Sequence, residues 1–95
     1  MEFTWDEAKR EKIIAEHKVD FAKIKDVFDD PFAVYFDDHE HSDETEIRQV
    51  IFGKTNNYGL IVLVYIFENE KIRCITARRA EKWMVNKYEQ QRKRF

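Results

Sequence analysis

Residues 60–67 constrain the fold of this chain most strongly, because the run Leu-Ile-Val-Leu-Val-Tyr-Ile-Phe is apolar at every position. A strand that is apolar on both faces lies inside a sheet that is covered on both sides. The next residues, Glu68, Asn69 and Glu70, predict a tight hairpin turn, after which residues 71–77 return beside the first strand. The sequence therefore predicts an antiparallel hairpin at the centre of a sheet.

Two more strands are predicted before this hairpin. Residues 32–36 form a short apolar strand, residues 37–45 a polar loop and residues 47–52 a second strand. Residues 53–59 contain the turn-forming pair Asn56-Asn57, and we expect them to connect the second strand to the central one. The predicted sheet thus has four antiparallel strands.

Helical patterns flank these strands. Asp6 is a favourable N-cap for a helix that runs to about His17 without glycine or proline. Asp20 is the predicted cap of a second helix, which ends before Pro31. Its apolar residues are Phe21, Ile24, Val27 and Phe28. After Arg79 the helical period returns, and the apolar stripe of this C-terminal helix is Ala80, Trp83, Met84 and Tyr88.

Two N-terminal helices, a four-stranded antiparallel sheet and a C-terminal helix make an α+β fold. The 95 residues contain neither internal repeats nor a linker, so we expect a single domain over residues 1–95. No apolar run approaches the roughly 18 residues that span a membrane, and Glu2 and Asp6 stand where a signal peptide carries basic residues. The single cysteine, Cys74, lies in an apolar strand, where a buried structural thiol is expected. These features predict a cytoplasmic protein.

The formal net charge of −2 conceals a segregation of charge along the chain. Residues 1–70 hold 8 Lys/Arg against 17 Asp/Glu, a balance of −9, whereas residues 71–95 hold 9 against 2, a balance of +7. Such asymmetry suits one surface for an anionic partner and another for a cationic one. Two halves that attract each other within the fold would explain it equally well.

Arg78 and Arg79 end the last predicted strand, in the run Ile72-Arg73-Cys74-Ile75-Thr76-Ala77-Arg78-Arg79-Ala80. An arginine side chain is always charged and presents a fixed fork of donors that suits phosphate oxygens. This strand end is therefore a candidate site for a polyanion. A solvated basic face is the alternative interpretation.

Several motifs of the chain occur in the order found in one family of bacterial proteins. The arginine run is similar to the family signature R-I-I-S-A-R-x-A. The other matches are Trp5-Asp6-Glu7-Ala8-Lys9, then His17, Val19 and Phe21, then Phe28-Asp29-Asp30-Pro31, Glu46-x-Arg48 and Gly53. From Phe3 to Tyr88 the chain resembles the BrnT family, the ribonuclease toxins of a bacterial toxin–antitoxin system.

The resemblance implies a RelE-like fold and a metal-independent endoribonuclease that inhibits translation and growth. In such enzymes the 2′-hydroxyl of RNA attacks the neighbouring phosphorus, and no cofactor or metal is needed. The implied partners are an RNA substrate and a BrnA-like ribbon-helix-helix antitoxin, with DNA contacted only through the antitoxin. A heterotetramer is one form that the complex with the antitoxin can take.

Arginines at strand ends can stabilise charge on phosphoryl oxygens, and proton transfer needs a histidine, tyrosine, lysine or carboxylate within reach. With the family positions in mind, the expected catalytic residues are Arg48, Arg73, Arg78, Arg79 and His17. The expected RNA-binding residues are Lys9, Lys54, Lys82, Lys87 and Tyr88. A partly buried histidine is the alternative interpretation of His17, and a core side chain that of Tyr88.

Three further features leave alternatives open. The run from Asp37 to His41 contains metal-ligand residue types, but we expect a solvated acidic turn there rather than a metal site. Aromatic residues such as Trp5 and Trp83, if exposed, would suit a partner protein. Lys18 and Gly59 replace a glycine and an arginine of the family pattern, so a degenerate toxin that only binds the antitoxin or nucleic acid is the alternative function.

Overall fold

The computed structural model describes residues 1–94, which form a mixed five-stranded sheet, two α-helices and two short 3-10 helices. The elements are β1 (Glu2–Thr4), α1 (Glu7–His17), η1 (Phe21–Lys23), η2 (Lys25–Asp29), β2 (Val34–Asp37), β3 (Arg48–Thr55), β4 (Gly59–Glu68), β5 (Lys71–Arg79) and α2 (Lys82–Lys93). The strands lie in the order β1-β5-β4-β3-β2. The predicted α+β class is confirmed.

The predicted central hairpin is formed by β4 and β5, which pair from Glu68 and Lys71 onwards. The turn places Asn69 and Glu70 at φ values of 52° and 62°. Two-residue hairpin turns with both central residues in this left-handed region match the right-handed twist of the strands. β4 has a neighbour on each side, so its position at the centre of the sheet is as predicted.

A bulge interrupts the pairing of β4 with β5. Val64 pairs with Thr76, whereas the next residue, Tyr65, pairs with Cys74, so β5 carries one extra residue. Beyond the bulge the alternation of β5 is shifted. Cys74 and Ala77 therefore face the same core although three positions separate them.

β3 is longer than predicted, because it continues through Gly53 to Thr55. The prediction that residues 53–59 form a connection is wrong in its first half. A Cβ atom on Gly53 would lie 3.1 Å from Ala33 Cβ and 3.2 Å from Val27 Cγ2, where η2 and the chain after it cross the strand. Glycine serves here for a close approach inside a strand, not for a turn.

The prediction of a wholly antiparallel sheet is wrong at one edge, where β1 pairs with β5 in parallel and Phe3 lies opposite Ile72. Three residues are too few to show a two-residue period in the sequence. β1 is held by packing instead, since Phe3 is partly buried and its ring centre lies 5.6 Å from that of Phe28. The other four strands are antiparallel, as predicted.

Asp6 caps α1 as predicted. Its carboxylate accepts a hydrogen bond from the Lys9 amide at 3.0 Å, and the helix ends at His17, before Lys18 in a left-handed conformation with φ 59°. Inside the helix Ile13 is buried against the sheet.

The predicted second α-helix is wrong in kind. Asp20 does cap the segment, because its side chain accepts from the Ala22 amide, but the chain then forms the 3-10 helices η1 and η2, separated at Ile24. Phe21, Ile24 and Val27 are all fully buried. Their spacing of three residues agrees with two successive 3-10 turns, each of which has three residues per turn, joined at Ile24.

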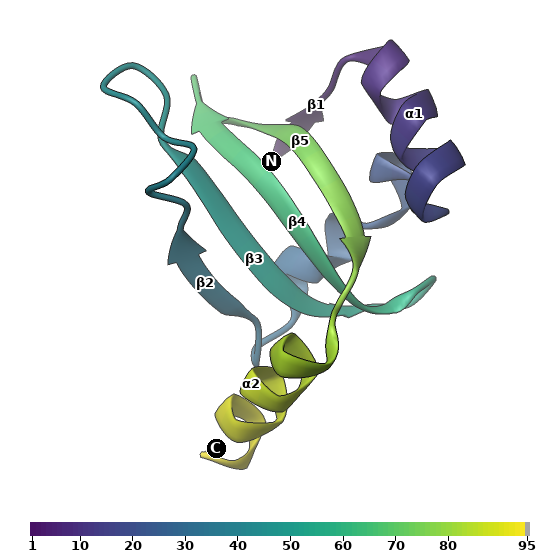
Figure 1. Ribbon diagram of the computed structural model, residues 1–95, viewed down its shortest axis with the longest axis vertical. Helices are drawn as coiled ribbons and strands as arrows, with labels where there is room; N and C mark the ends of the chain where they lie inside the picture. Colours follow the sequence, from purple (N-terminus) through teal and green to yellow (C-terminus); the bar gives the residue numbers. More distant parts are fainter. Residues whose placement is uncertain (95) are drawn as a thin grey trace.

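Helices cover the two faces of the sheet unequally. η1 and η2 lie behind the sheet in Figure 1 and α1 packs along β5, whereas α2 lies in front at the lower end of the sheet. α2 buries Met84 and Tyr88 against Val50, Phe52 and Val62, while Trp83 stays 50% exposed. Beyond the first turn of α2, towards the upper end of the sheet in Figure 1, this side of the sheet carries no helix. No helix within residues 1–94 is long and apolar enough to cross a membrane.

Candidate functional site

The side of the sheet on which α2 packs has a part that the helix does not cover, and we call this part the open sheet face. Two of the predicted arginines lie in one row on it. The register places Arg48 opposite Ile66 and Ile66 opposite Arg73. Side chains at paired positions point to the same face, so the two arginines flank Ile66 roughly 10 Å apart, two interstrand spacings. Arg48 shares the face of Val50 and Phe52, two and four residues further along β3, and these pack on α2. The fold thus brings the Glu46-x-Arg48 motif close to Arg73 of the later arginine run, although the two motifs are distant in the sequence.

Both arginines of this row have a buried Nε atom that makes no hydrogen bond within residues 1–94. One terminal nitrogen of Arg73 donates to Glu46 at 2.8 Å. Its Nε lies 3.0 Å from Glu68 Oε1, which is an ion pair in distance but is not aligned as a hydrogen bond. A hollow of about 200 Å³ adjoins the row and is also lined by Lys9 of α1. It therefore gathers three cationic side chains from three elements.

A groove of about 250 Å³ continues the open sheet face towards α2. Valines of β3 and β4 line its apolar part. Its polar and aromatic lining residues are Phe36, Asp38, His41, Thr76, Arg78 and Trp83. Of the predicted catalytic residues, Arg78 is the one that borders this groove.

Arg78 and Trp83 share one carboxylate at the rim of this groove. The guanidinium of Arg78 donates to Glu81, and the indole Nε1 of Trp83 donates to the other oxygen of Glu81 at 2.9 Å. These bonds and the guanidinium hold the pKa of Glu81 below its usual range. The Trp83 ring meets Phe52 edge to face, with ring centres 6.1 Å apart, and its outer half stays exposed. An exposed, oriented indole is a suitable platform for a nucleotide base.

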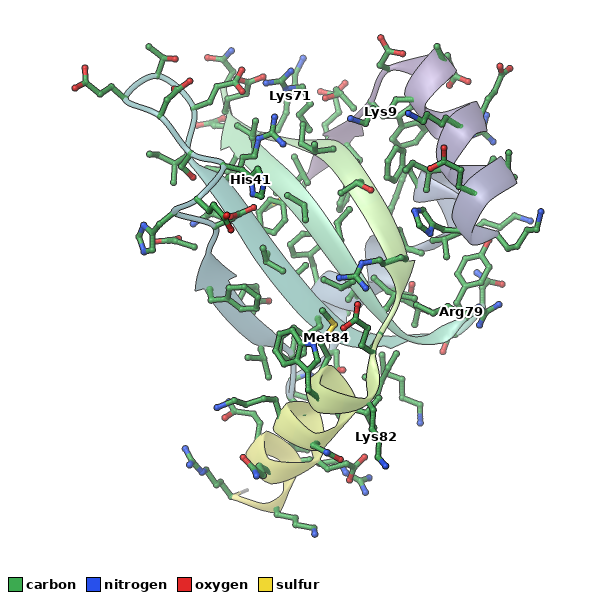
Figure 2. The ribbon with its side chains drawn as sticks, viewed as in Figure 1. Lys9, His41, Lys71, Arg79, Lys82 and Met84 are labelled. Atoms are coloured by element: carbon green, nitrogen blue, oxygen red, sulfur yellow. The ribbon has the colours of Figure 1, made fainter. Side chains whose placement is uncertain are left out.

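The loop between β2 and β3 brings Asp38 and His41 to the groove, and neither was predicted as a site residue. The Arg48 amide donates to Ser42 Oγ at 2.9 Å, the Ser42 hydroxyl donates to the Asp38 carbonyl, and the Asp38 amide donates to the Arg48 carbonyl at 2.8 Å. Figure 2 shows His41 projecting from this loop over the sheet. The sequence offers only adjacent acidic residues and histidines here, so no local pattern predicts the groove.

Arg79 and His17 line neither the groove nor the hollow. Arg79 lies on the other side of β5, where it donates to the Tyr58 carbonyl at 3.0 Å and its guanidinium carbon lies 5.4 Å from the Tyr58 ring centre. Figure 2 shows it beside the turn between β3 and β4, away from His41. His17, at the end of α1, lies 3.9 Å from Glu16. The structure therefore does not bring these two predicted residues to the open sheet face.

The four predicted RNA-binding lysines are dispersed. Lys9 lines the hollow beside the arginine row. Lys87 borders a second, apolar hollow of about 330 Å³, which shares Phe36 and Trp83 with the groove. Lys82 is exposed in the first turn of α2, and Lys54 is exposed near the end of β3, with its amide donating to Asp30 at 2.7 Å.

Tyr88, the fifth predicted RNA-binding residue, is 4% exposed and donates its hydroxyl to Asp30 Oδ2 at 2.8 Å. Burial and the bond to this carboxylate raise the pKa of Tyr88 to about 12. Asp30 also accepts from the amides of Phe32 and Lys54. Burial opposes ionisation of Asp30, but these hydrogen bonds outweigh it and hold its pKa below the usual range. Tyr88 thus anchors α2 to the segment before β2, and we leave it outside the site.

The structure also describes the cysteine and the metal-ligand residue types of the sequence. Burial raises the pKa of the Cys74 thiol to about 12, which agrees with a structural cysteine. Within residues 1–94, no three side chains of His, Cys, Asp or Glu lie close enough together to hold a metal ion.

Comparison with known proteins agrees with this fold. A family model of the ribonuclease toxin BrnT of type II toxin–antitoxin systems matches residues 5–83. The 1.1 Å crystal structure of the Brucella abortus ribonuclease toxin BrnT is similar, with a TM-score of 0.66 and 27% identity over 86% of this chain and 99% of that one. No curated protein matches the chain. The family match spans most of the sequence and confirms the resemblance. The chain therefore belongs to the BrnT family, the ribonuclease toxins of type II toxin–antitoxin systems.

Proposed function

We propose that this chain is a metal-independent endoribonuclease that inhibits translation and growth in the cytoplasm. The observation that carries the proposal is the convergence of Arg48, Arg73 and Arg78 on the open sheet face, beside a groove lined by polar side chains and an exposed indole. Arginine forks bind phosphate oxygens in two-point contacts and stabilise the negative charge that develops on them during cleavage. RNA is the polyanion that the family assignment favours.

The arginines would exchange carboxylate partners for phosphates when RNA binds. Arg73 is paired with Glu46 and Glu68, and Arg78 with Glu81; the side chains in these pairs are 37–52% exposed. Exposed ion pairs are worth only about 0–1 kcal/mol. Exchanging these glutamates for phosphate oxygens therefore costs little, and the carboxylates hold the guanidinium groups in place until then.

The proposal is tested with chain made by cell-free synthesis and a synthetic RNA in the presence of a chelator. We expect fragments that end in 2′,3′-cyclic phosphate and 5′-hydroxyl groups, the products of attack by the 2′-hydroxyl. Combined substitution of Arg48, Arg73 and Arg78 by alanine should abolish cleavage. The matched control replaces the exposed Lys12, Arg92 and Lys93, which removes the same charge elsewhere. Equal cleavage by the two triple variants would contradict the proposal.

The type II family implies an antitoxin partner, which we propose to be a BrnA-like ribbon-helix-helix protein that also provides all contact with DNA. Exposed aromatic side chains that line the groove with Arg78 suit such a partner: Phe36 is 41% exposed and Trp83 50%. Buried aromatic anchors commonly carry most of the affinity of an interface, and charge speeds the encounter. The complex is expected to be a heterotetramer.

Charge reversal tests this partner surface. We expect Arg78→Glu to slow association with the antitoxin at low salt and Arg79→Glu, on the other side of the sheet, to leave the rate within about threefold, since charged groups near an interface act mainly on association. Stopped-flow mixing at several salt concentrations measures both rates. Equal slowing by the two variants would place the interface elsewhere. Light scattering of the complex measures its mass and so tests the expected heterotetramer.

A second candidate function is a degenerate toxin that only binds the antitoxin or nucleic acid. This function is favoured by the glutamates that pair with Arg73 and Arg78. Their negative charge offsets the positive charge of the arginines, which would otherwise attract RNA. A binding module retains a salt-dependent affinity for RNA without producing fragments. The cleavage assay above therefore separates the two candidates.

A further inference from the structure

The side chains of Asp38 and His41 form a hydrogen-bonded pair at the groove. The ring Nδ1 of His41 lies 3.0 Å from Asp38 Oδ2 and 3.2 Å from Oδ1. An ionised carboxylate only accepts hydrogen bonds, so the hydrogen of the neutral imidazole resides on Nδ1. Nε2 then carries the lone pair, and it makes no hydrogen bond within residues 1–94. The pair thus presents a free basic nitrogen on a side chain that lines the groove.

Hydrogen bonds hold the pair on one side, and its other side is open to solvent. The side chain of Asp38 is 21% exposed and that of His41 62%. The His41 amide also donates to Asp38 Oδ1 at 3.3 Å, and Ser42 ties the same loop to the first residue of β3, Arg48. The imidazole is therefore oriented by the protein while its free edge stays accessible to a ligand.

The groove places this imidazole among the groups that RNA cleavage requires. His41 comes from the loop between β2 and β3, Arg78 and Thr76 from β5, and Trp83 from α2, and all four line one groove of about 250 Å³. Arg78 supplies positive charge for a phosphate, and Trp83 offers its ring to a base. Cleavage also needs a group that accepts a proton, and the always-charged arginines cannot supply it.

We propose that His41 is the general base of RNA cleavage and that Asp38 is its positioning residue. This inference rests on the proposed ribonuclease function and names the group that moves the proton. A general base must lie within hydrogen-bond reach of the proton it removes, and imidazole is the side chain most often used near neutral pH. Among the three histidines of the chain, His17 and His39 do not line the groove.

The cleavage step balances without a further reactant. Nε2 of His41 takes the proton of the 2′-hydroxyl as the O2′–P bond forms, and the P–O5′ bond breaks. The departing 5′-oxygen takes one proton from solvent, and the imidazolium returns one proton to solvent. The products are a 2′,3′-cyclic phosphate and a 5′-hydroxyl, and no water is consumed. Asp38 stabilises the imidazolium while it exists.

The experiment compares single-turnover cleavage and RNA affinity for four variants of the full chain. His41→Ala and His41→Gln remove the base, and the glutamine amide can still donate to Asp38 and preserve the loop. Asp38→Asn keeps an acceptor for Nδ1 but removes the charge. His39→Ala is the matched control, because it removes an exposed histidine of the same loop that does not line the groove. Thermal unfolding confirms that each variant is folded.

We expect both His41 variants to cleave at least about 100-fold more slowly, the usual contribution of a general base, with RNA affinity unchanged. Asp38→Asn should lower the single-turnover rate at least about tenfold and leave the RNA affinity unaltered, since it acts on the base and not on binding. His39→Ala should cleave within about threefold of the native rate, as a residue outside the chemistry does.

Three outcomes would overturn the assignment. A His41→Gln variant that cleaves at the native rate would exclude His41 as the base while leaving the ribonuclease proposal intact. Equal loss in His39→Ala and His41→Ala would assign the effect to the loop and not to the groove histidine. A native chain that cleaves no RNA would overturn the proposed function and this inference together.

Discussion

Arg78 and Arg79 are adjacent in β5, yet their guanidinium groups lie on opposite sides of the sheet. That of Arg78 reaches Glu81 at the groove, and that of Arg79 lies over the Tyr58 ring. Successive side chains of a strand point to opposite faces, so two neighbouring arginines cannot serve one site on a flat sheet. The arginine pair that stands out in the sequence is therefore divided between a candidate RNA site and the opposite side.

Alanine substitution of each arginine separates these roles. Arg78→Ala should lower the rate of RNA cleavage about 100-fold, the usual effect of removing one donor that stabilises developing charge. Arg79→Ala should leave the rate within about threefold, since it removes only an exposed contact with Tyr58. Single-turnover cleavage at saturating protein measures both. A larger loss in Arg79→Ala than in Arg78→Ala would reverse our assignment of the two faces.

The arginine row should determine the salt dependence of RNA binding. Substituting Arg48 or Arg73 by alanine should weaken binding of any single-stranded RNA and lower the slope of log Kd against log salt by roughly one per residue, since each removes one phosphate contact. Fluorescence anisotropy over a salt series gives the slopes. Lys12→Ala on the outer face of α1 is the control and should keep the native slope. An unchanged slope in Arg48→Ala would remove this residue from the RNA path.

The hydrogen bond between Tyr88 and Asp30 should stabilise the packing of α2. Tyr88→Phe removes the donor at 2.8 Å from a partly buried carboxylate, and we expect a loss of about 1–2 kcal/mol in the free energy of unfolding. Urea titration followed by circular dichroism measures it. Tyr35→Phe, at a tyrosine that is 55% exposed, is the control and should leave the free energy of unfolding unchanged. A stable Tyr88→Phe variant that loses RNA binding would instead return Tyr88 to the site.

Acid should destabilise the protein partly through Asp20. This buried carboxylate accepts two hydrogen bonds from Arg10, at 2.8 and 2.9 Å, which hold its pKa below the usual value. In the unfolded chain an aspartate takes up its proton at about pH 4, whereas in the folded chain Asp20 does so at lower pH because its pKa is lowered. The unfolded state therefore binds more protons in this range, and stability falls as the pH falls.

Replacing Asp20 by asparagine tests this origin of the acid response. The variant should be less stable at neutral pH, because Arg10 loses its partner, and its free energy of unfolding should depend less steeply on pH below about pH 4. Denaturant titrations at a series of pH values give both quantities. An unaltered pH dependence would assign the acid response to other carboxylates, of which Asp30 is the first candidate.

Cys74 should be unreactive in the folded protein. It is 3% exposed and its pKa is raised by burial to about 12, so little thiolate exists at neutral or mildly alkaline pH. A thiol reagent at pH 8 should label the native chain slowly and the urea-unfolded chain at once. Rapid labelling without denaturant would reveal local opening of β5.

Much of the fold could be predicted from local pattern. The apolar run of β4, the hairpin turn at Asn69 and Glu70, and the cap at Asp6 each depend on interactions within a few residues, and each is found where the sequence predicts it. The elements that were predicted wrongly have a local pattern that is too short or ambiguous. β1 is three residues long, and the apolar spacing of the segment beginning at Phe21 fits an α-helix as well as a 3-10 helix.

The candidate site divides in the same way. The sequence by itself determined the family, the arginine motifs and the segregation of positive charge toward the C-terminus, because these depend only on residue identity and order. Only the tertiary structure decided which arginines share a face, since strand register sets Arg48 and Arg73 on either side of Ile66, and alternation along β5 separates Arg78 from Arg79. It also decided the position of His41, because a loop is placed by hydrogen bonds such as those of Ser42 and not by a repeating pattern. Register and loop closure join residues distant in the chain, and for that physical reason composition and period do not encode them.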